Sequence, residues 1–255
     1  MLKFFDNVVS IFVILIIALI IIPLPAFMLD MMFIINIALS LIILLITMYI
    51  KSSLEFFVFP SLLLVTTLLR LGLNVSSTRL ILRDEGQAGH IISAFSNFVL
   101  SGNIVIGFVI FIIIVLVNFL VITKGAERVS EVAARFKLDA MPGKQMAIDA
   151  DLSSGLIDEQ TARQRRNDIQ RETEFYGSMD GATKFVKGDA IMSIIITLIN
   201  FIGGTIIGMV QGGNTFGEVL SIYSIATVGG FTGSCTFDFH SNRYDSYPRC
   251  FRFQP

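Results

Sequence analysis

Long apolar runs separated by short polar interruptions dominate the chain. Five of these runs are close to or above the roughly 20 residues that a helix needs to cross a bilayer core about 30 Å thick. The runs lack the alternating pattern of barrel strands, and backbone groups in hydrocarbon must bond within their own segment. The pattern therefore predicts membrane-spanning helices over Val8–Leu29, Met31–Ile50, Phe56–Val75, Asn103–Thr123 and Ala190–Val210, and a sixth run that starts near Phe216 and fades after Val228.

Charged residues gather in one segment between the fourth and fifth runs. Residues 124–189 hold 11 Lys/Arg and 12 Asp/Glu, which is 23 of the 39 charges of the chain. Apolar residues at helical spacing predict a short amphipathic helix over Gly125–Phe136, and the Met141–Gly143 stretch is expected to interrupt it. A second, largely polar helix is predicted over Asp158–Tyr176.

These patterns predict an all-α, polytopic membrane protein with a charged, partly helical cytoplasmic loop. We expect a membrane region with four spans over residues 1–123, a charged loop over 124–188, and the fifth span with the start of a sixth over 189–230. Loops rich in Lys and Arg stay on the cytoplasmic side of a membrane, so the charged loop is expected there.

Two arginines conflict with this orientation. If four spans precede residue 124, Arg79 and Arg83 fall on the outer side, against the positive-inside rule. Either the third run is re-entrant, or these arginines face protein. The sequence leaves both possibilities open.

Two ionisable residues stand at places where lipid disfavours charge. Arg70 interrupts the third run, and it is either a polar lining or subunit contact, or an arginine that snorkels from the end of a span. Asp189 stands at the entry to the fifth span, and its position alone favours a helix N-cap over a proton-binding group.

Gly204 and Gly208 favour close helix packing. Interhelical hydrogen bonds are the expected use of Asn36, Asn74, Asn103, Asn118 and Asn200.

Composition excludes several classes of protein. The chain is 54% hydrophobic and 15% charged, against about 25% charged residues in soluble domains. Its net charge of −1 provides no basic field for nucleic acid. It has only two histidines, and its similarities to a P-loop near Gly143 and to a calcium loop near Asp149 lack the required residues. We therefore expect no enzymatic activity, no cofactor and no metal.

Four ungapped stretches resemble the export-gate family of flagella and injectisomes. They are Arg70–Arg79, Lys124–Phe136, Leu138–Leu152 and Phe175–Ala182, and the resemblance extends over residues 1–229. The Asp-Ala-Met-Pro-Gly wording within the third stretch is more similar to the flagellar branch than to the injectisome branch.

The resemblance implies a subunit of a type III protein export apparatus in the bacterial inner membrane. Members have eight spans and a large cytosolic C-terminal domain, and they form a homo-oligomeric ring at the basal body. Their partners are other export-gate membrane proteins, the export ATPase complex, and the export substrates and chaperones that the cytosolic domain receives. The membrane part couples proton flow to protein export.

The resemblance also implies roles for particular residues. Asp189 matches the acid implicated in proton coupling, and this reverses the preference for a cap. Arg128, Arg135 and Asp139 match charged positions of the cytoplasmic loop that are important for export. A further membrane acid of the family is missing, because this chain has Gly230 at that position.

Residues 231–255 depart from both the apolar pattern and the family. When codons for Cys235–Pro255 are read one base later, permitted choices encode Ala-Leu-Leu-Ile-Ser-Thr-Ala-Thr-Gly-Met and a continuation that resembles the family. We therefore expect this tail to be out of frame, which makes the chain the N-terminal part of a longer protein that lacks its docking domain. A genuine short C-terminus is the alternative.

Three other functions stay open at this point. The chain is alternatively an injectisome export-gate subunit, or a stand-alone ion or solute transporter whose path is lined by Arg70 and Asp189. It is also possible that the shortened product inserts into the membrane and does not export.

Overall fold

Helix is the only regular structure in the residues that the computed structural model describes, as the sequence predicts. These residues are 14–22, 24–50, 56–84, 86, 89–100, 104–120, 127–211, 217–220 and 222–230, so the tail over 231–255 lies outside them. The labelled helices are α2 (Ala26–Tyr49), α3 (Phe59–Arg83), α4 (His90–Leu100), α5 (Ile104–Asn118), α6 (Glu127–Asp139), α7 (Met141–Ser153) and α8 (Glu159–Gln211). Residues 14–21, 217–220 and 222–230 are also helical.

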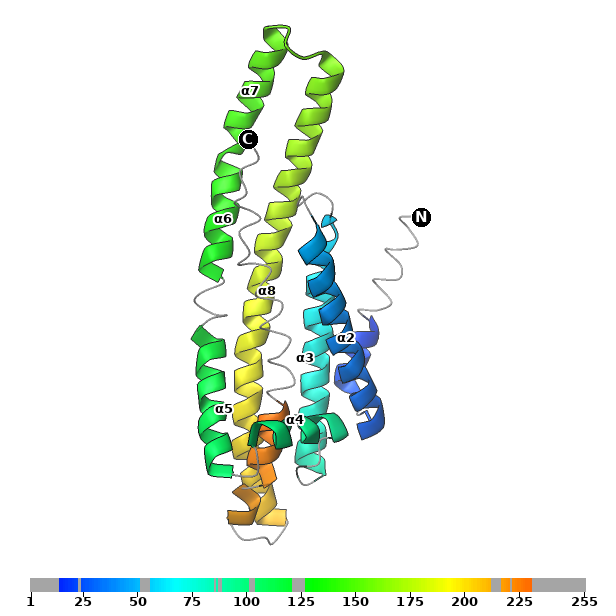
Figure 1. Ribbon diagram of the computed structural model, residues 1–255. Helices are drawn as coiled ribbons and strands as arrows, with labels where there is room; N and C mark the ends of the chain where they lie inside the picture. Colours follow the sequence, from blue (N-terminus) through cyan, green and yellow to red (C-terminus); the bar gives the residue numbers. More distant parts are fainter. Residues whose placement is uncertain are drawn as a thin grey trace.

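The helices form an elongated bundle around α8, the longest helix (Figure 1). Helices α2 and α3 run antiparallel on one side of α8, and α5 lies on the other side. Helix α3 makes the most extensive contact with α8. The short helix α4 lies across one end of the bundle, whereas α6, α7 and the first half of α8 form a hairpin that projects from the opposite end.

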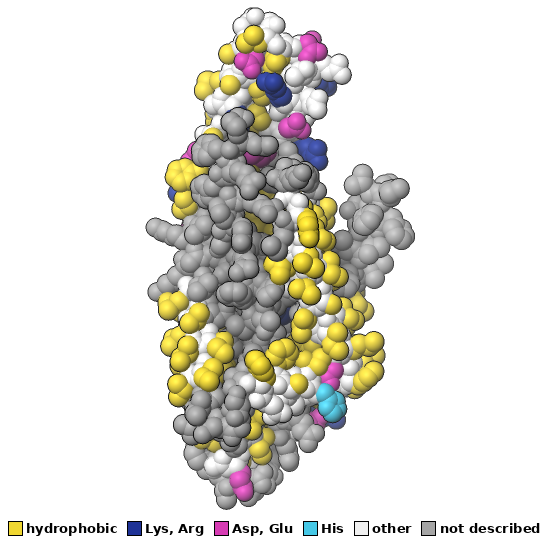
Figure 2. Space-filling view, viewed as in Figure 1, with side chains coloured by type: hydrophobic (Ala, Val, Ile, Leu, Met, Phe, Trp, Pro, Cys, Tyr) yellow, Lys and Arg dark blue, Asp and Glu magenta, His cyan; other side chains and the backbone are white. Residues whose placement is uncertain are grey.

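The bundle places apolar side chains outside and polar side chains inside. On α2, Phe27 and Ile34 are 77% and 58% exposed, while Asn36 and Ser40 are buried. Figure 2 shows hydrophobic side chains along the flanks and charged ones concentrated on the projecting hairpin. This arrangement is the one expected of a protein surrounded by lipid, in which apolar side chains face the hydrocarbon and polar side chains face the interior. Within the described residues, three helices are long and apolar enough to cross a membrane: Ala26–Thr47, Phe59–Arg83 and Glu159–Val210.

The boundary between the first two predicted spans is wrong. The runs Val8–Leu29 and Met31–Ile50 meet at Asp30 in the sequence, but α2 already begins at Ala26, directly after its N-cap Pro25. A proline cannot donate a backbone hydrogen bond and fits poorly inside a helix, so the helix begins after Pro25 and not after the charge. Asp30 therefore lies within the second helix.

Asp30 caps a helix that the hydrophobic pattern does not predict. Its carboxylate oxygens Oδ2 and Oδ1 accept hydrogen bonds from the backbone N–H groups of His90, at 2.9 Å, and of Ile91, at 3.2 Å. Gly89 precedes α4 at φ +95°, and a Cβ there would lie 2.5 Å from Oδ1 of Asp30. The N-terminus of α4 is thus satisfied by a side chain of α2, which the local sequence does not reveal.

The other predicted runs agree with the structure in position. The third run forms one continuous helix, α3, which extends from Phe59 to Arg83, eight residues beyond the predicted end at Val75. The fourth run, Asn103–Thr123, contains α5. The predicted amphipathic helix appears as α6, and the expected interruption separates it from α7. The chain resumes a helix there because Pro142 lies in the first turn of α7, where it has no hydrogen bond to lose.

The predicted separation between the polar helix Asp158–Tyr176 and the fifth span is wrong. Helix α8 runs without interruption for 53 residues, which corresponds to about 80 Å. The stretch between Tyr176 and Ala190 contains glycines but no proline, so nothing in it removes a backbone hydrogen bond. The same helix therefore belongs to both the membrane region and the charged hairpin.

Apolar contacts and ion pairs hold the hairpin together. Met141 and Ile148 of α7 are buried together with Ala162 and Ile169 of α8. At the partly buried edge, the Nζ of Lys144 lies 2.9 Å from Oε2 of Glu172. The hairpin thus has a small core of its own outside the apolar bundle.

The two glycines of the predicted packing motif do receive another helix. Tyr223 lies directly over the Cα of Gly204, and a Cβ on Gly208 would lie 2.7 Å from Cγ1 of Val219 and 2.8 Å from Cε2 of Tyr223. This confirms the expected close helix contact.

We predict that Gly204→Ala destabilises the protein, because a methyl group there would overlap the ring of Tyr223. Overpacking of this kind costs about 1–3 kcal/mol. The adjacent Gly203→Ala is the matched control, since its Cβ would lie 3.9 Å from the nearest side chain, that of Leu82. Unfolding in detergent measures both variants, and equal effects would contradict the packing argument.

The first turn of α8 supplies a prediction for pH. Hydrogen bonds from the side chain and backbone N–H of Thr161 lower the pKa of Asp158 from its ordinary value of 3.8. A lowered pKa stabilises the folded state above pH 3.8, and the stabilisation disappears as the pH falls through the folded-state value. Asp158→Ala should therefore speed amide exchange in this turn at neutral pH, and the difference from wild type should vanish in acid. Asp168→Ala, an exposed change on the same helix, is the control.

Candidate functional site: a buried ion pair between α3 and α8

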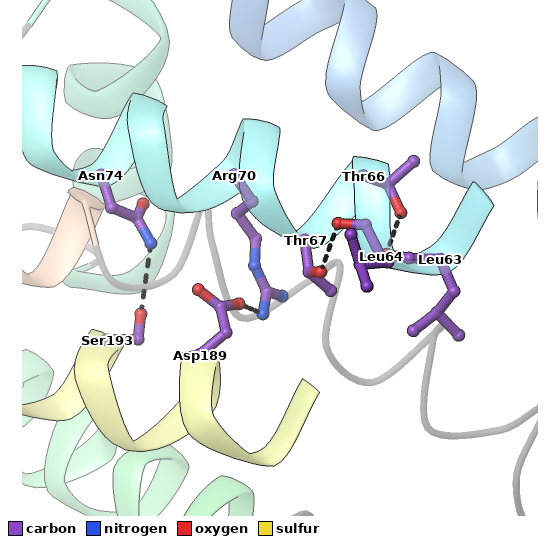
Figure 3. A network of polar contacts seen from close by, with 8 residues as sticks. All are labelled: Leu63, Leu64, Thr66, Thr67, Arg70, Asn74, Asp189 and Ser193. Atoms are coloured by element: carbon purple, nitrogen blue, oxygen red, sulfur yellow. Dashed lines mark hydrogen bonds and ion pairs between the residues drawn. The ribbon is translucent and has the colours of Figure 1, made fainter. Parts of the chain in front are cut away.

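Arg70 of α3 and Asp189 of α8 form an ion pair inside the bundle (Figure 3). The pair joins Nη2 of Arg70 to Oδ2 of Asp189. Arg70 is 0% exposed and Asp189 is 5% exposed, so both charges are removed from lipid and from water. An unpaired charge in hydrocarbon is energetically costly, so each residue lowers the free-energy cost of burying the other.

The structure rules out one of the alternatives for each residue. Arg70 is the twelfth residue of the 25-residue helix α3 and is fully buried, so it is not a snorkelling arginine at the end of a span. Asp189 lies 30 residues after the start of α8, so the interpretation as an N-cap is wrong. The cap interpretation failed because it assumed a helix start at the edge of the apolar run, whereas the helix continues from the hairpin.

Polar side chains continue from the pair along the facing sides of the two helices. On α8, Ser193, Thr197 and Asn200 follow Asp189 at steps of four, four and three residues, and all three are buried. These steps place them on the same helix face. Hydrophobic periodicity did not single out Ser193 or Thr197, although their spacing from Asp189 carried the signal.

The facing side of α3 carries matching polar residues. Asn74 and Ser77 lie one and two turns beyond Arg70, and both are buried. The Nδ2 of Asn74 donates a hydrogen bond of 3.5 Å to Oγ of Ser193 (Figure 3). This confirms the expected interhelical hydrogen bond for Asn74, and it extends the polar contact between α3 and α8 by one turn.

An aromatic cluster lies on the hairpin side of the pair. Phe59 and Leu63 of α3 are buried there with Phe175, Tyr176 and Val186 of α8. Phe175 and Tyr176 meet edge to face, with ring centroids 5.5 Å apart. The buried polar side chains that continue from the pair along α3 and α8, here called the polar stripe, are thus bounded by apolar packing toward the hairpin.

Asp189 also borders an apolar groove on the flank between α3 and α8. The groove has a volume of about 410 Å³, and its walls include Leu68, Leu71, Phe185 and Met192. Lys184, which pairs with Asp180 at 2.8 Å, also borders it.

The charged loop residues do not join this site. Arg135 and Asp139 are exposed on α6, while Ala134 on the same helix is buried. Arg128 lies on α6 as well, but its side chain is outside the described part of the structure. The exposed charges leave these positions accessible from solvent, and the structure separates them from the buried pair.

One of the two arginines that conflict with the expected orientation, Arg79, is exposed but hydrogen-bonded to the protein backbone. The guanidinium group of Arg79 donates to the carbonyl oxygens of Ile21, at 2.9 Å, and Ile20, at 3.2 Å. It therefore satisfies the last carbonyls of the helix over 14–21. Arg83 is 71% exposed and lies 3.5 Å from Asp84.

The described residues contain no group of three His, Cys, Asp or Glu side chains that could hold a metal ion. The arrangement offers ionic and hydrogen-bond chemistry instead: a carboxylate whose Oδ1 has no hydrogen-bond partner among the described residues, beside a fixed guanidinium.

We predict that Arg70→Met or Asp189→Leu alone lowers the free energy of unfolding by about 3–5 kcal/mol, because each leaves one buried charge without its partner. The double variant should be more stable than either single variant. Titration with a denaturing detergent measures all three. Lys184→Met with Asp180→Leu, an exposed pair on α8, provides the matched control, for which we expect less than about 1 kcal/mol. A double variant that is as unstable as the sum of the single variants would show that the two charges do not interact.

Comparison with known proteins agrees with the sequence and the fold. The FHIPEP family profile matches residues 16–232. Flagellar biosynthesis protein FlhA of Bacillus subtilis is 57% identical over 224 residues, which cover 88% of this chain and 33% of that protein. FlhA of Escherichia coli is 52% identical over 223 residues, covering 86% and 32%. Low calcium response locus protein D of Yersinia pestis is 51% identical over 224 residues, covering 88% and 32%.

The chain spans about a third of the length of these curated relatives. No solved structure matches it. The family profile covers most of the chain, including the segments that carry α3, α8 and the ion pair between them. From its sequence, its apolar helices and these relatives, the chain belongs to the FHIPEP family.

Proposed function

We propose that this chain contains the membrane part of a flagellar export-gate subunit, in which Asp189 couples proton flow to protein export. The observation that carries the proposal is the position of Asp189 on α8, where it is paired with Arg70 inside the bundle. The uninterrupted helix links this position to the charged hairpin. The FlhA relatives, which are named as flagellar biosynthesis proteins, support the flagellar setting.

Protonation of Asp189 would change the contact between α3 and α8. A proton on the carboxylate removes its negative charge and with it the ionic attraction to Arg70, which leaves a buried cation without a counter-ion. Loss of this attraction favours a shift of the two helices relative to one another. Release of the proton restores the carboxylate and the pair.

Helix α8 supplies a route by which such a shift reaches the cytoplasm. A rigid helix moves as a unit, and α8 extends about 45 Å from Asp189 to its start at Glu159. Its first half packs against α6 and α7, so a displacement at Asp189 would be transmitted to the hairpin. We propose that partner proteins contact the loop at the exposed Arg135 and Asp139 and at Arg128.

The proposal includes the setting of the protein. We place it as a multi-pass subunit of the bacterial inner membrane at the flagellar basal body, with residues 1–123 and 189–230 in the membrane region and 124–188 in the cytoplasm. Its proposed partners are further copies in a ring, the other export-gate membrane proteins and the export ATPase complex. Export substrates and their chaperones are proposed to bind a cytosolic domain outside this chain.

Asp189→Asn in an intact genomic copy tests the proposal. The amide retains the size of the side chain but cannot cycle between charged and neutral forms, so we expect motility to be lost while the protein still inserts into the membrane. Swimming in soft agar and the amount of protein in membrane fractions are the measurements.

The matched control is Asp180→Asn, which makes the same change on the same helix at a half-exposed carboxylate. It should leave motility close to wild type. Wild-type motility of the Asp189→Asn strain would refute the proposed role, and equal loss in both strains would assign the effect to α8 as a whole and not to the buried acid.

A further inference from the structure

The polar stripe between α3 and α8 lines a small cavity. Its walls come from α3, from α8 and from the helical residues 222–230. The volume is about 10 Å³, near the roughly 10–15 Å³ that one water molecule requires. The lining residues are Asn74, Ser77, Ser193, Ile196, Thr197, Asn200, Thr227 and Gly230.

Two buried polar atoms border this cavity without a partner. Oδ1 of Asn200 and Oγ1 of Thr227 have no hydrogen-bond partner among the described residues, and the two side chains are 5% and 3% exposed. A buried polar atom without a hydrogen bond is costly, and an unrecorded water molecule is a common resolution. Both atoms belong to residues that line the same cavity.

The remaining lining oxygens are able to accept hydrogen bonds. The hydroxyl of Ser77 donates to the carbonyl oxygen of Asn74 at 2.9 Å, and that of Thr197 donates to the carbonyl oxygen of Ser193 at 2.7 Å. A hydroxyl that donates its hydrogen still has lone pairs to accept another. The cavity therefore offers the two to four polar partners that a buried water needs, and most of them are acceptors.

We propose that this cavity, the Asn200–Thr227 cavity, binds one ordered water molecule, and that this water relays the proton between Asp189 and the end of the bundle opposite the hairpin. Only the proton relay rests on the proposed function of Asp189. The water site itself rests on the cavity and its two unpartnered atoms.

Helix geometry explains why a relay is needed. Asn200 lies eleven residues beyond Asp189 on α8, which corresponds to about 16 Å along the axis, far beyond one hydrogen bond. Ser193 lies between them on the same face and lines the cavity. A water in the cavity therefore extends a path that the side chains alone leave incomplete.

The relay conserves atoms and charge at each step. Once protonated Asp189 comes within hydrogen-bond distance of Ser193, one turn along the same face of α8, its carboxylic acid passes the proton to Oγ of Ser193, and the hydroxyl proton that Ser193 already carries moves to the water. The water becomes hydronium and gives up one proton to solvent water at the end of the bundle opposite the hairpin. Asp189 is left as a carboxylate and pairs again with Arg70, which keeps its own proton throughout.

Water at the site is measurable without any transport activity. The full chain in lipid bilayers, with ¹³C-labelled Asn and Thr, reports magnetisation transfer from water in solid-state NMR. We expect transfer to Asn200 and Thr227 and none to Thr205, a buried threonine that donates to the carbonyl of Phe201 and does not line the cavity. Absence of transfer to both Asn200 and Thr227 would overturn the proposal.

The relay is tested by proton flux into liposomes that contain the full chain under a potassium-diffusion potential. Thr227→Val keeps the side-chain shape and should lower the flux by about tenfold, because a charged intermediate loses a hydrogen-bond partner. Thr227→Ser should retain the flux, and Thr205→Val is the matched control that should leave it unchanged.

The outcomes separate the two proposals. If the flux is unaffected by Asp189→Asn, the proposed function fails, and the NMR experiment alone decides the water site. If Asp189→Asn abolishes the flux but Thr227→Val does not reduce it, the relay through the cavity is refuted. Loss of flux in Thr227→Val and Thr205→Val alike would also refute it, because the effect would then belong to any buried hydroxyl.

Discussion

The cost of an unpaired charge in hydrocarbon is the constraint on which this structure depends. Arg70 and Asp189 belong to helices that cross the bundle, and each removes the electrostatic penalty of the other. Their pairing fixes where α3 meets α8, and the hydrogen bond from Asn74 to Ser193 repeats the contact one turn further along. The most extensive helix contact of the bundle thus contains its only described buried ion pair, and a change of charge at one carboxylate acts directly on that contact.

Packing elsewhere in the bundle relies on shape. Between apolar helices in lipid there is little hydrophobic driving force, so close van der Waals contact and hydrogen bonds hold them together. Gly204 and Gly208 receive Tyr223, and the hydroxyl of Ser96 on α4 donates to the carbonyl of Ile225 at 2.6 Å. These contacts hold residues 222–230 against α8 and α4, where Thr227 and Gly230 line one wall of the Asn200–Thr227 cavity.

Because α8 is continuous, it connects the ion pair directly to the hairpin. A loop between the hairpin and the membrane region would absorb a local shift, whereas an unbroken helix passes it on. The hairpin has its own apolar contacts around Ile148 and Ile169, so it responds as one unit. Gly230, where the family resemblance leads us to expect an acid, lines the cavity and not the groove beside Asp189. Gly230 and Asp189 therefore border different hollows of the bundle.

The sequence by itself determined the helical class, the approximate positions of the apolar helices and the charged segment, because length and hydropathy are properties of contiguous residues. It also singled out Arg70 and Asp189 as out of place in lipid, but not that they are partners, because 119 positions separate them and only the fold brings them together. The capping of α4 by Asp30 was hidden for the same reason, since donor and acceptor lie 60 positions apart. Only the tertiary structure decided that the polar faces of α3 and α8 meet, because burial is set by the packing of whole helices and not by local composition.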